Sequence, residues 1–430
     1  MRILFCCQLY APSVGGVQEV VRQIAERLVL RGHEITVATT TMPERKLETL
    51  NGVRLVEFSV KGNAVEGMEG DVAGYQCFVV GGAFDAMLVY AAQQWTFDAL
   101  WPVLDSIPFA TVFVPCGFSN FYEPTYASYF AEMPAVMAKF GQMVFNATHY
   151  RDIDLARQHG LNNFCIVPNG ACEDIFNVAV DPLFRERHAI PQDSFLFLNV
   201  GSFTGLKGQA ELLQAFGRMQ LPPGRHASLL LNGNVVRTLE GGALSRARKL
   251  VRVTRSRGMT FALTQVWNKL IRRKASPQQQ ANRINQACTD RRVVVSDFAR
   301  AELTQAFLAA DLFVFSSNFE YSPLVLFESA AAGTPFLSVS VGNSAEIAEW
   351  TGAGVLCPSS VDPMGYTRVS DEVLAVEMSA LMNQQDLLER LGRTGRRNWA
   401  EKFTWEKIAT QYEQLFNRLL KLAVDSEKND

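Results

Sequence analysis

The feature that most constrains the fold is a repeated alternation of short apolar strands with helical spacers. Strand patterns occur at residues 2–7, 34–40, 53–60, 86–92, 109–114, 142–147 and 164–168, and they resume at 194–201, 228–234, 292–297 and 312–316. Strands separated by helices favour a doubly wound parallel sheet. With 430 residues, the chain is too long for one ordinary core, so we expect an α/β protein of two domains, each of about 200 residues.

Composition is that of a folded protein, with 48% hydrophobic and 20% charged residues. No run approaches the ~18 apolar residues of a membrane span, and the N-terminal RILFCCQLY lacks a cleavage site and is typical of a first strand. We therefore expect a cytoplasmic protein. The eight cysteines show no C-x-x-C spacing, which predicts reduced, mostly buried thiols, with Cys6 and Cys7 on opposite faces of one strand.

Positive charge is concentrated in one segment, although the whole chain has a net charge of only −2. Residues 237–274 contain eleven Lys or Arg against one acid, Glu240, with apolar stripes between the cations. This composition is typical of an interfacial amphipathic helix, and it equally fits an ordinary helical pair with a basic solvent face. Nucleic acid is not an expected partner because no recognition motif accompanies the charge.

A candidate binding element lies in the stretch DLFVFSSNFEYSPLVLFESAAAGTP, residues 311–335. A strand ends at polar residues, Glu320 follows on a loop, and an apolar helix begins with Pro323 at its first position and Ser322 as N-cap. The free amides of Leu324 and Val325, with the helix dipole, predict an anion site. Glu320 and Glu328 flank that site, and their carboxylates suit vicinal hydroxyls of a sugar. Alternatively, both are solvated acids.

Two glycine-bearing loops also follow strands. Gly15 and Gly16 precede an apolar helix, but G-x-G-x-x-G is absent, which weakens a dehydrogenase interpretation and leaves a plain turn as an alternative. Lys207 lies in the loop after the strand at 194–201, where an ammonium could reach a diphosphate. A solvated loop cation is the alternative there.

Three motifs together resemble the family 4 glycosyltransferases, a retaining group with the GT-B fold of two Rossmann-like domains that face each other across a cleft. The motifs are FEYSPLVLFESAAAGTPFL, which is similar to the E-x7-E element, PNG at 168–170 and KG at 207–208. The resemblance implies that Glu320 contacts the transferred sugar and Glu328 the nucleotide ribose. It further implies that the loop of Gly15 and Gly16 lets the backbone approach the donor phosphate.

The resemblance also implies the domain organisation. We expect an acceptor-binding domain at 1–183, a nucleotide-sugar-binding domain at 190–395, and at 396–430 a crossover segment that packs back on the first domain. Its apolar run from Trp399 to Leu422 is expected to form one helix. The stretch 181–192, which is charged and has two prolines, is the predicted linker.

The sequence departs from the family pattern at two candidate site residues. Ser202 stands where the family has an arginine in its GR…KG element, which removes one of two expected cationic phosphate contacts. Cys116, before Gly117, stands where the family has a histidine beside the sugar. A retaining transfer in this family is thought to need no enzymic nucleophile, so Cys116 need not abolish catalysis.

The function that the resemblance implies is a retaining transfer of a hexose-type sugar in surface polysaccharide biosynthesis. We expect it to be metal-independent, because no metal cluster of the Asp-x-Asp kind lies where a metal-dependent transferase would need it. The donor is a nucleoside diphosphate sugar, no cofactor is expected beyond that co-substrate, and the acceptor is a glycan or a lipid-linked molecule. An anionic membrane surface at the inner face of the plasma membrane is a further predicted partner, through 237–274. Two alternatives are a donor-binding scaffold with weakened catalysis, suggested by Ser202 and Cys116, and a GT-B sugar-nucleotide epimerase.

Overall fold

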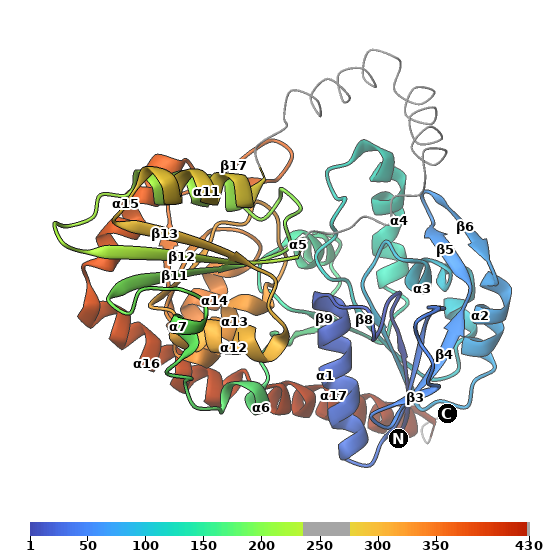
Figure 1. Cartoon of the computed structure of the whole chain (residues 1–430). Helices are drawn as coiled ribbons and strands as arrows, with labels where there is room; N and C mark the ends of the chain where they lie inside the picture. Colours follow the sequence, from blue (N-terminus) through green and yellow to red (C-terminus); the bar gives the residue numbers. More distant parts are fainter. Residues whose placement is uncertain (235–275, 428–430) are drawn as a thin grey trace. The chain divides into compact units, whose positions relative to one another are not determined.

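The computed structural model describes residues 1–234 and 276–427, with side chains up to Leu422, and these residues form two compact units (Figure 1). Unit 1 comprises Met1–Ala179, Phe319–Arg368 and Asp386–Asp430, and unit 2 comprises Val180–Asn318 and Val369–Gln385. The basic segment predicted to contact a membrane, 237–274, lies outside the described residues. Each unit is an α/β assembly built on parallel strands.

Unit 1 contains an eight-stranded sheet with the order β10-β9-β8-β7-β1-β2-β4-β3. All neighbouring strands in it are parallel except β3 and β4, which pair antiparallel. The strands are β1 Arg2–Cys6, β2 Glu34–Thr40, β3 Thr49–Leu50, β4 Val53–Phe58, β7 Ala86–Tyr90, β8 Ala110–Val114, β9 Gln142–Phe145 and β10 Phe164–Ile166. A separate hairpin follows β4, with strands β5 Val60–Asn63 and β6 Gly67–Gly70.

The sheet separates two apolar cores because successive strand side chains point to opposite faces. Along β1 and the residue that follows it, Leu4 and Cys6 enter one core, whereas Phe5 and Cys7 enter the other. The predicted opposite orientation of the two cysteines is therefore confirmed. Four of the eight cysteines are buried, three are partly buried and Cys77 is exposed, so the thiols are less uniformly buried than expected.

Helices cover both faces of this sheet, which makes it doubly wound as predicted. The first core includes residues of α2, α3, α4 and α5, and the second includes residues of α1 and α17. The bounds are α1 Gly16–Leu30, α2 Val72–Val80, α3 Trp95–Asp98, α4 Ala127–Met137, α5 Arg151–Gln158, α6 Glu173–Phe176 and α17 Trp405–Glu427, with 3-10 turns at Trp101–Ser106 and Pro124–Tyr126.

The later segments of unit 1 supply a second set of elements. These are α13 Leu324–Ala332, β15 Phe336–Val339, α14 Ser344–Thr351, β16 Gly354–Cys357, the hairpin strands β17 Ser360–Val361 and β18 Thr367–Arg368, and α16 Gln385–Lys402, which belongs to unit 1 from Asp386. Strands β15 and β16 pair in parallel, and β17 and β18 pair antiparallel.

The C-terminal run, predicted as one helix from Trp399 to Leu422, is instead two helices. α16 ends at Lys402 and α17 begins at Trp405. The break is fixed by partners from elsewhere in the chain: the Phe403 carbonyl accepts from the Ala171 amide at 3.0 Å. The Trp405 amide donates to Glu173 Oε2 at 3.1 Å.

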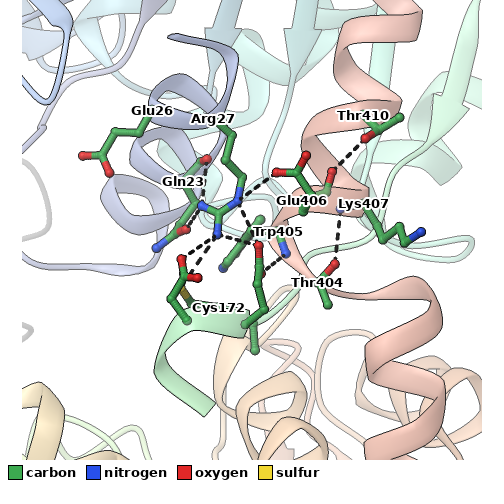
Figure 2. A network of polar contacts seen from close by, with 12 residues as sticks. Gln23, Glu26, Arg27, Cys172, Thr404, Trp405, Glu406, Lys407 and Thr410 are labelled. Carbon is green, nitrogen blue, oxygen red and sulfur yellow. Dashed lines mark hydrogen bonds and ion pairs between the residues drawn. The ribbon is translucent and has the colours of Figure 1, made fainter. Parts of the chain in front are cut away.

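Helix α17 lies against α1 through a polar network around Arg27 (Figure 2). Arg27 Nη2 donates to Glu173 Oε1 at 2.8 Å and lies 3.8 Å from Cys172 Sγ, and Arg27 Nε lies 3.7 Å from Glu406 Oε2. One turn further on, Arg31 bonds to Glu406 at 2.6 Å and to Glu413 at 2.7 Å. The C-terminal helix is therefore attached to the first helix of unit 1.

Unit 2 contains four parallel strands in the order β13-β12-β11-β14. Its elements are α7 Phe184–Arg187, β11 Ser194–Val200, α8 Gln209–Arg218, β12 His226–Asn232, α11 Pro277–Ala287, β13 Arg291–Ser296, α12 Arg300–Ala309, β14 Leu312–Phe315 and α15 Asp371–Met382. The predicted linker 181–192 packs on this unit, where Arg185 pairs with Asp311 at 3.0 Å and Arg187 with Glu302 at 2.9 Å.

Candidate active site

The loop that carries Ser202 and Lys207 joins β11 to α8 in unit 2. Gly208, the N-cap of α8, has a φ of +68°, and a Cβ there would lie 1.8 Å from the Ser316 carbonyl oxygen, so the position requires glycine. The Lys207 stem packs beside Gly201, whose added Cβ would lie 3.3 Å from Lys207 Cγ. Ser202 and Lys207 therefore share one tightly packed loop at the carboxyl end of a parallel strand.

The same loop is held by the residues that follow β14. The Asn318 amide donates to the Leu206 carbonyl at 2.8 Å, and Ser317 Oγ donates to that carbonyl at 3.2 Å. Carboxyl ends of parallel strands are where ligands bind in open α/β sheets. The geometry of unit 2 therefore brings Lys207 to the edge where a ligand is expected.

Helix α13 begins one residue later than predicted. Its first residue is Leu324, and Pro323 occupies the N-cap position with φ −71° and ψ 119°, an extended conformation that the proline ring allows. Ser322 Oγ, the predicted cap, has no hydrogen-bond partner among the described residues. The amides of Leu324 and Val325 remain the first two of the helix, and such amides lack partners within the helix itself.

Glu328 lies in the second turn of α13, with 6% of its surface exposed. A buried carboxylate costs several kcal/mol unless it is paired or hydrogen-bonded. The alternative of a solvated helix-surface acid is therefore wrong for Glu328.

Three consecutive carbonyls fix the loop of Glu320. The Glu320 carbonyl accepts from Tyr150 Oη at 2.7 Å, the Tyr321 carbonyl from the Asn343 amide at 2.8 Å, and the Ser322 carbonyl from Asn169 Nδ2 at 3.1 Å. Burial raises the pKa of Tyr150 to about 12, with Arg151 opposing, so the phenol stays a neutral donor. Asn169 belongs to the PNG motif, which thus positions the Glu320 loop within unit 1.

The turn at Cys116 has three consecutive residues with left-handed backbone: Cys116 at φ +62°, Gly117 at +86° and Phe118 at +55°. Such strain in residues other than glycine is typical of functional sites. The turn faces Tyr321, since a Cβ on Gly117 would lie 2.6 Å from that ring. Burial and then Asp152 raise the pKa of Cys116 to about 12, so the thiol is protonated at neutral pH and is not an activated nucleophile.

Asp152 connects this turn to the Glu320 loop, and sequence reasoning missed it. Its carboxylate accepts from the Gly117 amide at 2.9 Å and hydrogen-bonds the Tyr321 side chain. Tyr321 Oη in turn accepts from the Asn146 amide at 3.0 Å. Burial raises the pKa of Asp152 to about 6, against these hydrogen bonds. The structure thus brings Cys116 and the Glu320 loop together.

Gly15 and Gly16 begin α1 in unit 1, where Gly15 has an extended backbone with φ 179°. A Cβ on Gly15 would lie 2.5 Å from Gln18 Oε1, the flexible end of a side chain. The structure thus places the pair between β1 and α1, with Cys116 and Glu320 on other loops of the same unit.

A pocket of about 260 Å³ opens beside Glu320 in unit 1. Its lining residues include aromatic, charged and hydroxyl side chains: Tyr122, Tyr150, Arg151, Asp154, Phe319, Glu320, Ser340 and Thr367. Glu320 is therefore not simply a solvated loop acid; it borders a concave site.

No group of three or more His, Cys, Asp or Glu side chains in 1–234 and 276–427 is arranged to hold a metal ion. Within the part of the chain that the structure describes, the helices are too short or too polar to span a bilayer.

Comparison with known proteins identifies a family and a partial relative. A family model described as glycosyl transferases group 1 matches residues 180–398, about half of the chain. The N-acetyl-alpha-D-glucosaminyl L-malate synthase of Bacillus anthracis is 30% identical over 112 residues, which span 26% of this chain and only 27% of that protein.

Solved structures resemble the whole chain. Sucrose-phosphate synthase from Thermosynechococcus elongatus superposes with a TM-score of 0.70 at 17% identity, covering 98% of this chain and 99% of that one. Anabaena HepE in complex with UDP gives a TM-score of 0.68 at 16% identity, covering 97% and 100%. At these identities the likeness establishes the fold.

Proposed function

Because the chain belongs to the group 1 glycosyl transferases, we propose that it is a retaining enzyme that moves a hexose-type sugar from a nucleoside diphosphate sugar to a glycan or lipid-linked acceptor, in surface polysaccharide biosynthesis. The GT-B fold class predicted from the sequence motifs is confirmed. Support for the donor class comes from HepE, whose structures were solved with UDP and with UDP-glucose.

The observation that carries the proposal is the setting of Lys207. Its loop follows a parallel strand, ends at a left-handed glycine N-cap and precedes the amino terminus of α8. An ammonium at such a site suits a diphosphate, whose charge grows as the glycosidic bond breaks. Stabilising that leaving group is the main catalytic contribution that we assign to this chain.

The other candidate residues take supporting roles. Glu328, buried on α13, would accept hydrogen bonds from the ribose hydroxyls, while the amides of Leu324 and Val325 would face donor phosphate oxygens. Glu320 would contact the transferred sugar. The protonated thiol of Cys116 is unsuited to attack, which fits a mechanism without an enzymic nucleophile.

Metal independence is part of the proposal. The one Asp-x-Asp sequence near the site, Asp152-Ile153-Asp154, starts helix α5, where residues two apart do not face each other. Asp152 is buried, whereas the Asp154 side chain is 56% exposed, so the two carboxylates do not converge. We expect turnover to be unchanged by EDTA.

The test is release of nucleoside diphosphate from a panel of nucleotide sugars, with and without saccharide acceptors, by wild type and Lys207→Ala. We expect Lys207→Ala to lower kcat more than donor affinity, because the lysine acts mainly on the developing charge. Lys46→Ala, which changes an exposed lysine in unit 1, is the control. If turnover of Lys207→Ala is within twofold of wild type, Lys207 is a solvated loop cation without a catalytic role.

A calorimetric arm tests the donor site separately. Glu328→Ala should bind the matched nucleoside diphosphate about 10- to 100-fold more weakly, because charge-assisted hydrogen bonds contribute roughly 1.5–3 kcal/mol. An unchanged Kd in a folded Glu328→Ala protein would refute the ribose assignment.

A second candidate, a donor-binding scaffold, is favoured by Ser202, which replaces the second phosphate-binding cation. In the nucleotide-sugar panel a scaffold would bind a donor without turnover. An epimerase, the third alternative, would instead form an isomeric nucleotide sugar.

A further inference from the structure

The pocket beside Glu320 has a fixed aromatic wall. The Arg151 guanidinium lies 4.6 Å from the ring centre of Tyr122, 5.4 Å from that of Tyr150 and 5.1 Å from that of Phe319. Arg151 Nη2 also donates to the Gly365 carbonyl at 3.1 Å. Arg151 therefore contacts all three rings and the loop between β17 and β18, and it holds them together at the pocket.

The β17–β18 hairpin closes tightly on these side chains. Gly365 has a φ of +76°, and a Cβ on it would lie 2.6 Å from both Arg151 Nη2 and the Tyr122 ring. Despite this packing, Tyr122 is 49% exposed. A large aromatic side chain that is held in place yet open to solvent at a pocket is a ready stacking platform.

The polar lining of the pocket favours hydroxyl groups over anions. Glu320 and Asp154 bring two carboxylates against the single guanidinium of Arg151, and Ser340 and Thr367 add hydroxyls. Carboxylates accept hydrogen bonds from vicinal hydroxyls and repel phosphate. The volume of about 260 Å³ is below the ~300–1,000 Å³ of pockets that bind drug-sized ligands.

We propose that this pocket binds one uncharged pyranose ring of the acceptor, with the C–H face of the sugar stacked on Tyr122 and its hydroxyls bound by Asp154 and Arg151. The inference rests on the proposed function and specifies its acceptor as a saccharide. Glu320, assigned to the transferred sugar, borders the same pocket, so the two sugars would lie next to each other.

The binding test uses the full chain without nucleotide. Saturation-transfer NMR is recorded with methyl glycosides of glucose, galactose, mannose and N-acetylglucosamine, and with glucose 6-phosphate as the anionic probe. We expect at least one methyl glycoside to bind, binding to weaken about tenfold in Tyr122→Ala, and Tyr122→Phe to retain it. Lys46→Ala is the control, since Lys46 is an exposed residue of unit 1 that does not line the pocket.

A kinetic arm separates this inference from the proposed function. Where a donor is turned over, Tyr122→Ala and Asp154→Asn should raise the acceptor KM about tenfold with a smaller change in kcat, whereas the exposed control Asp105→Asn should change neither.

Three results would overturn the pocket assignment: no glycoside binds, Tyr122→Ala binds as wild type does, or glucose 6-phosphate binds in preference to the glycosides. Glycoside binding in a protein that turns over no donor would instead count against the proposed function.

Discussion

Asp98 is a buried carboxylate away from the candidate site, and it makes the stability of unit 1 depend on pH. It is 2% exposed and accepts hydrogen bonds from Tyr129 Oη at 2.7 Å and from the Ala64 amide at 2.9 Å. Burial raises the pKa of Asp98 to about 6 from an ordinary 3.8, despite those hydrogen bonds. The unfolded chain therefore ionises at lower pH than the folded chain does, and stability is lost as pH rises from about 4 to about 6.

The free energy of unfolding of wild type should fall between pH 4 and pH 6, and we predict that Asp98→Asn reduces this fall by up to about 3 kcal/mol, since two pKa units correspond to ~1.4 kcal/mol each. The free energy is measured by urea unfolding at pH 4, 5, 6 and 7. Asp105→Asn, which replaces an exposed acid, is the control. Asp152, also with a pKa of about 6, retains its own share of the pH dependence in this variant. If the free energy of unfolding of Asp98→Asn falls between pH 4 and 6 as steeply as that of wild type, Asp98 is not the source of the pH dependence.

At the residue scale, sequence reasoning located the motif residues but not their partners. Glu320, Glu328 and Lys207 were chosen from spacing and resemblance, and the structure places them on a pocket-lining loop, a buried helical turn and a packed glycine loop. Asp152 and Tyr321 were missed because their contacts join residues far apart in the chain. No local pattern encodes such pairs.

At the element scale, a largely buried guanidinium, that of Arg27, contributes to the attachment of α17 to α1. Arg27 is 8% exposed and bonds Glu173 and Gln23, with Glu406 and Cys172 close by (Figure 2). Removing it leaves the partly buried Glu173 carboxylate with less compensation, although the Trp405 amide still donates to it.

We predict that Arg27→Met, which keeps the apolar stem, lowers the free energy of unfolding by about 2–4 kcal/mol. Hydrogen exchange should rise first in the start of α17. Arg22→Met is the matched control on the same helix: its pairs with Glu19 and Glu26 are more exposed and should contribute less than about 1 kcal/mol. Equal losses in the two variants would show that burial of Arg27 is not decisive.

Hydrophobic periodicity located the main strands up to β14, but it did not locate β15 and β16 or the break in the C-terminal helix. The predicted strand 34–40 coincides with β2, because Ile, Val and Thr favour strands and the residues between Glu34 and Thr40 are buried. The predicted helix 399–422 is interrupted at Phe403 and Thr404, where the chain bonds to Ala171 and Glu173. Those partners lie more than 200 residues earlier, beyond the reach of a helical pattern.

At the scale of the whole molecule, the alternation of strands and helices predicted the α/β class, but chain order did not reveal the make-up of each unit. Residues 319–368 belong to unit 1 with 1–179. One reason is Glu346, which accepts from the Thr148 amide at 2.9 Å and from the His149 amide at 2.9 Å. These hydrogen bonds join residues almost 200 positions apart, so no local sequence pattern predicts them.

The concentration of charge at 237–274 carries a prediction for the intact protein. Eleven cations at up to ~1 kcal/mol each near an anionic leaflet could hold the chain reversibly at a membrane. We expect cosedimentation with phosphatidylserine liposomes that falls as salt rises, and its loss when Arg272, Arg273 and Lys274 are changed to Glu.

The control changes three exposed cations outside the segment, Lys46, Arg54 and Lys61, to Glu. Cosedimentation should persist in this control. If wild type fails to sediment with anionic liposomes at low salt, the segment is not a membrane contact and a soluble acceptor gains support.

The three bonded carbonyls of residues 320–322 affect the thermodynamics of ligand binding. Their donors come from Tyr150, Asn343 and Asn169, so the backbone of this loop is already fixed within unit 1. Ordering a residue costs roughly 1–2 kcal/mol of conformational entropy, and here that cost was incurred during folding. A sugar that meets Glu320 therefore gains affinity from a preorganised loop, and the entropy lost on binding should come mainly from the ligand itself.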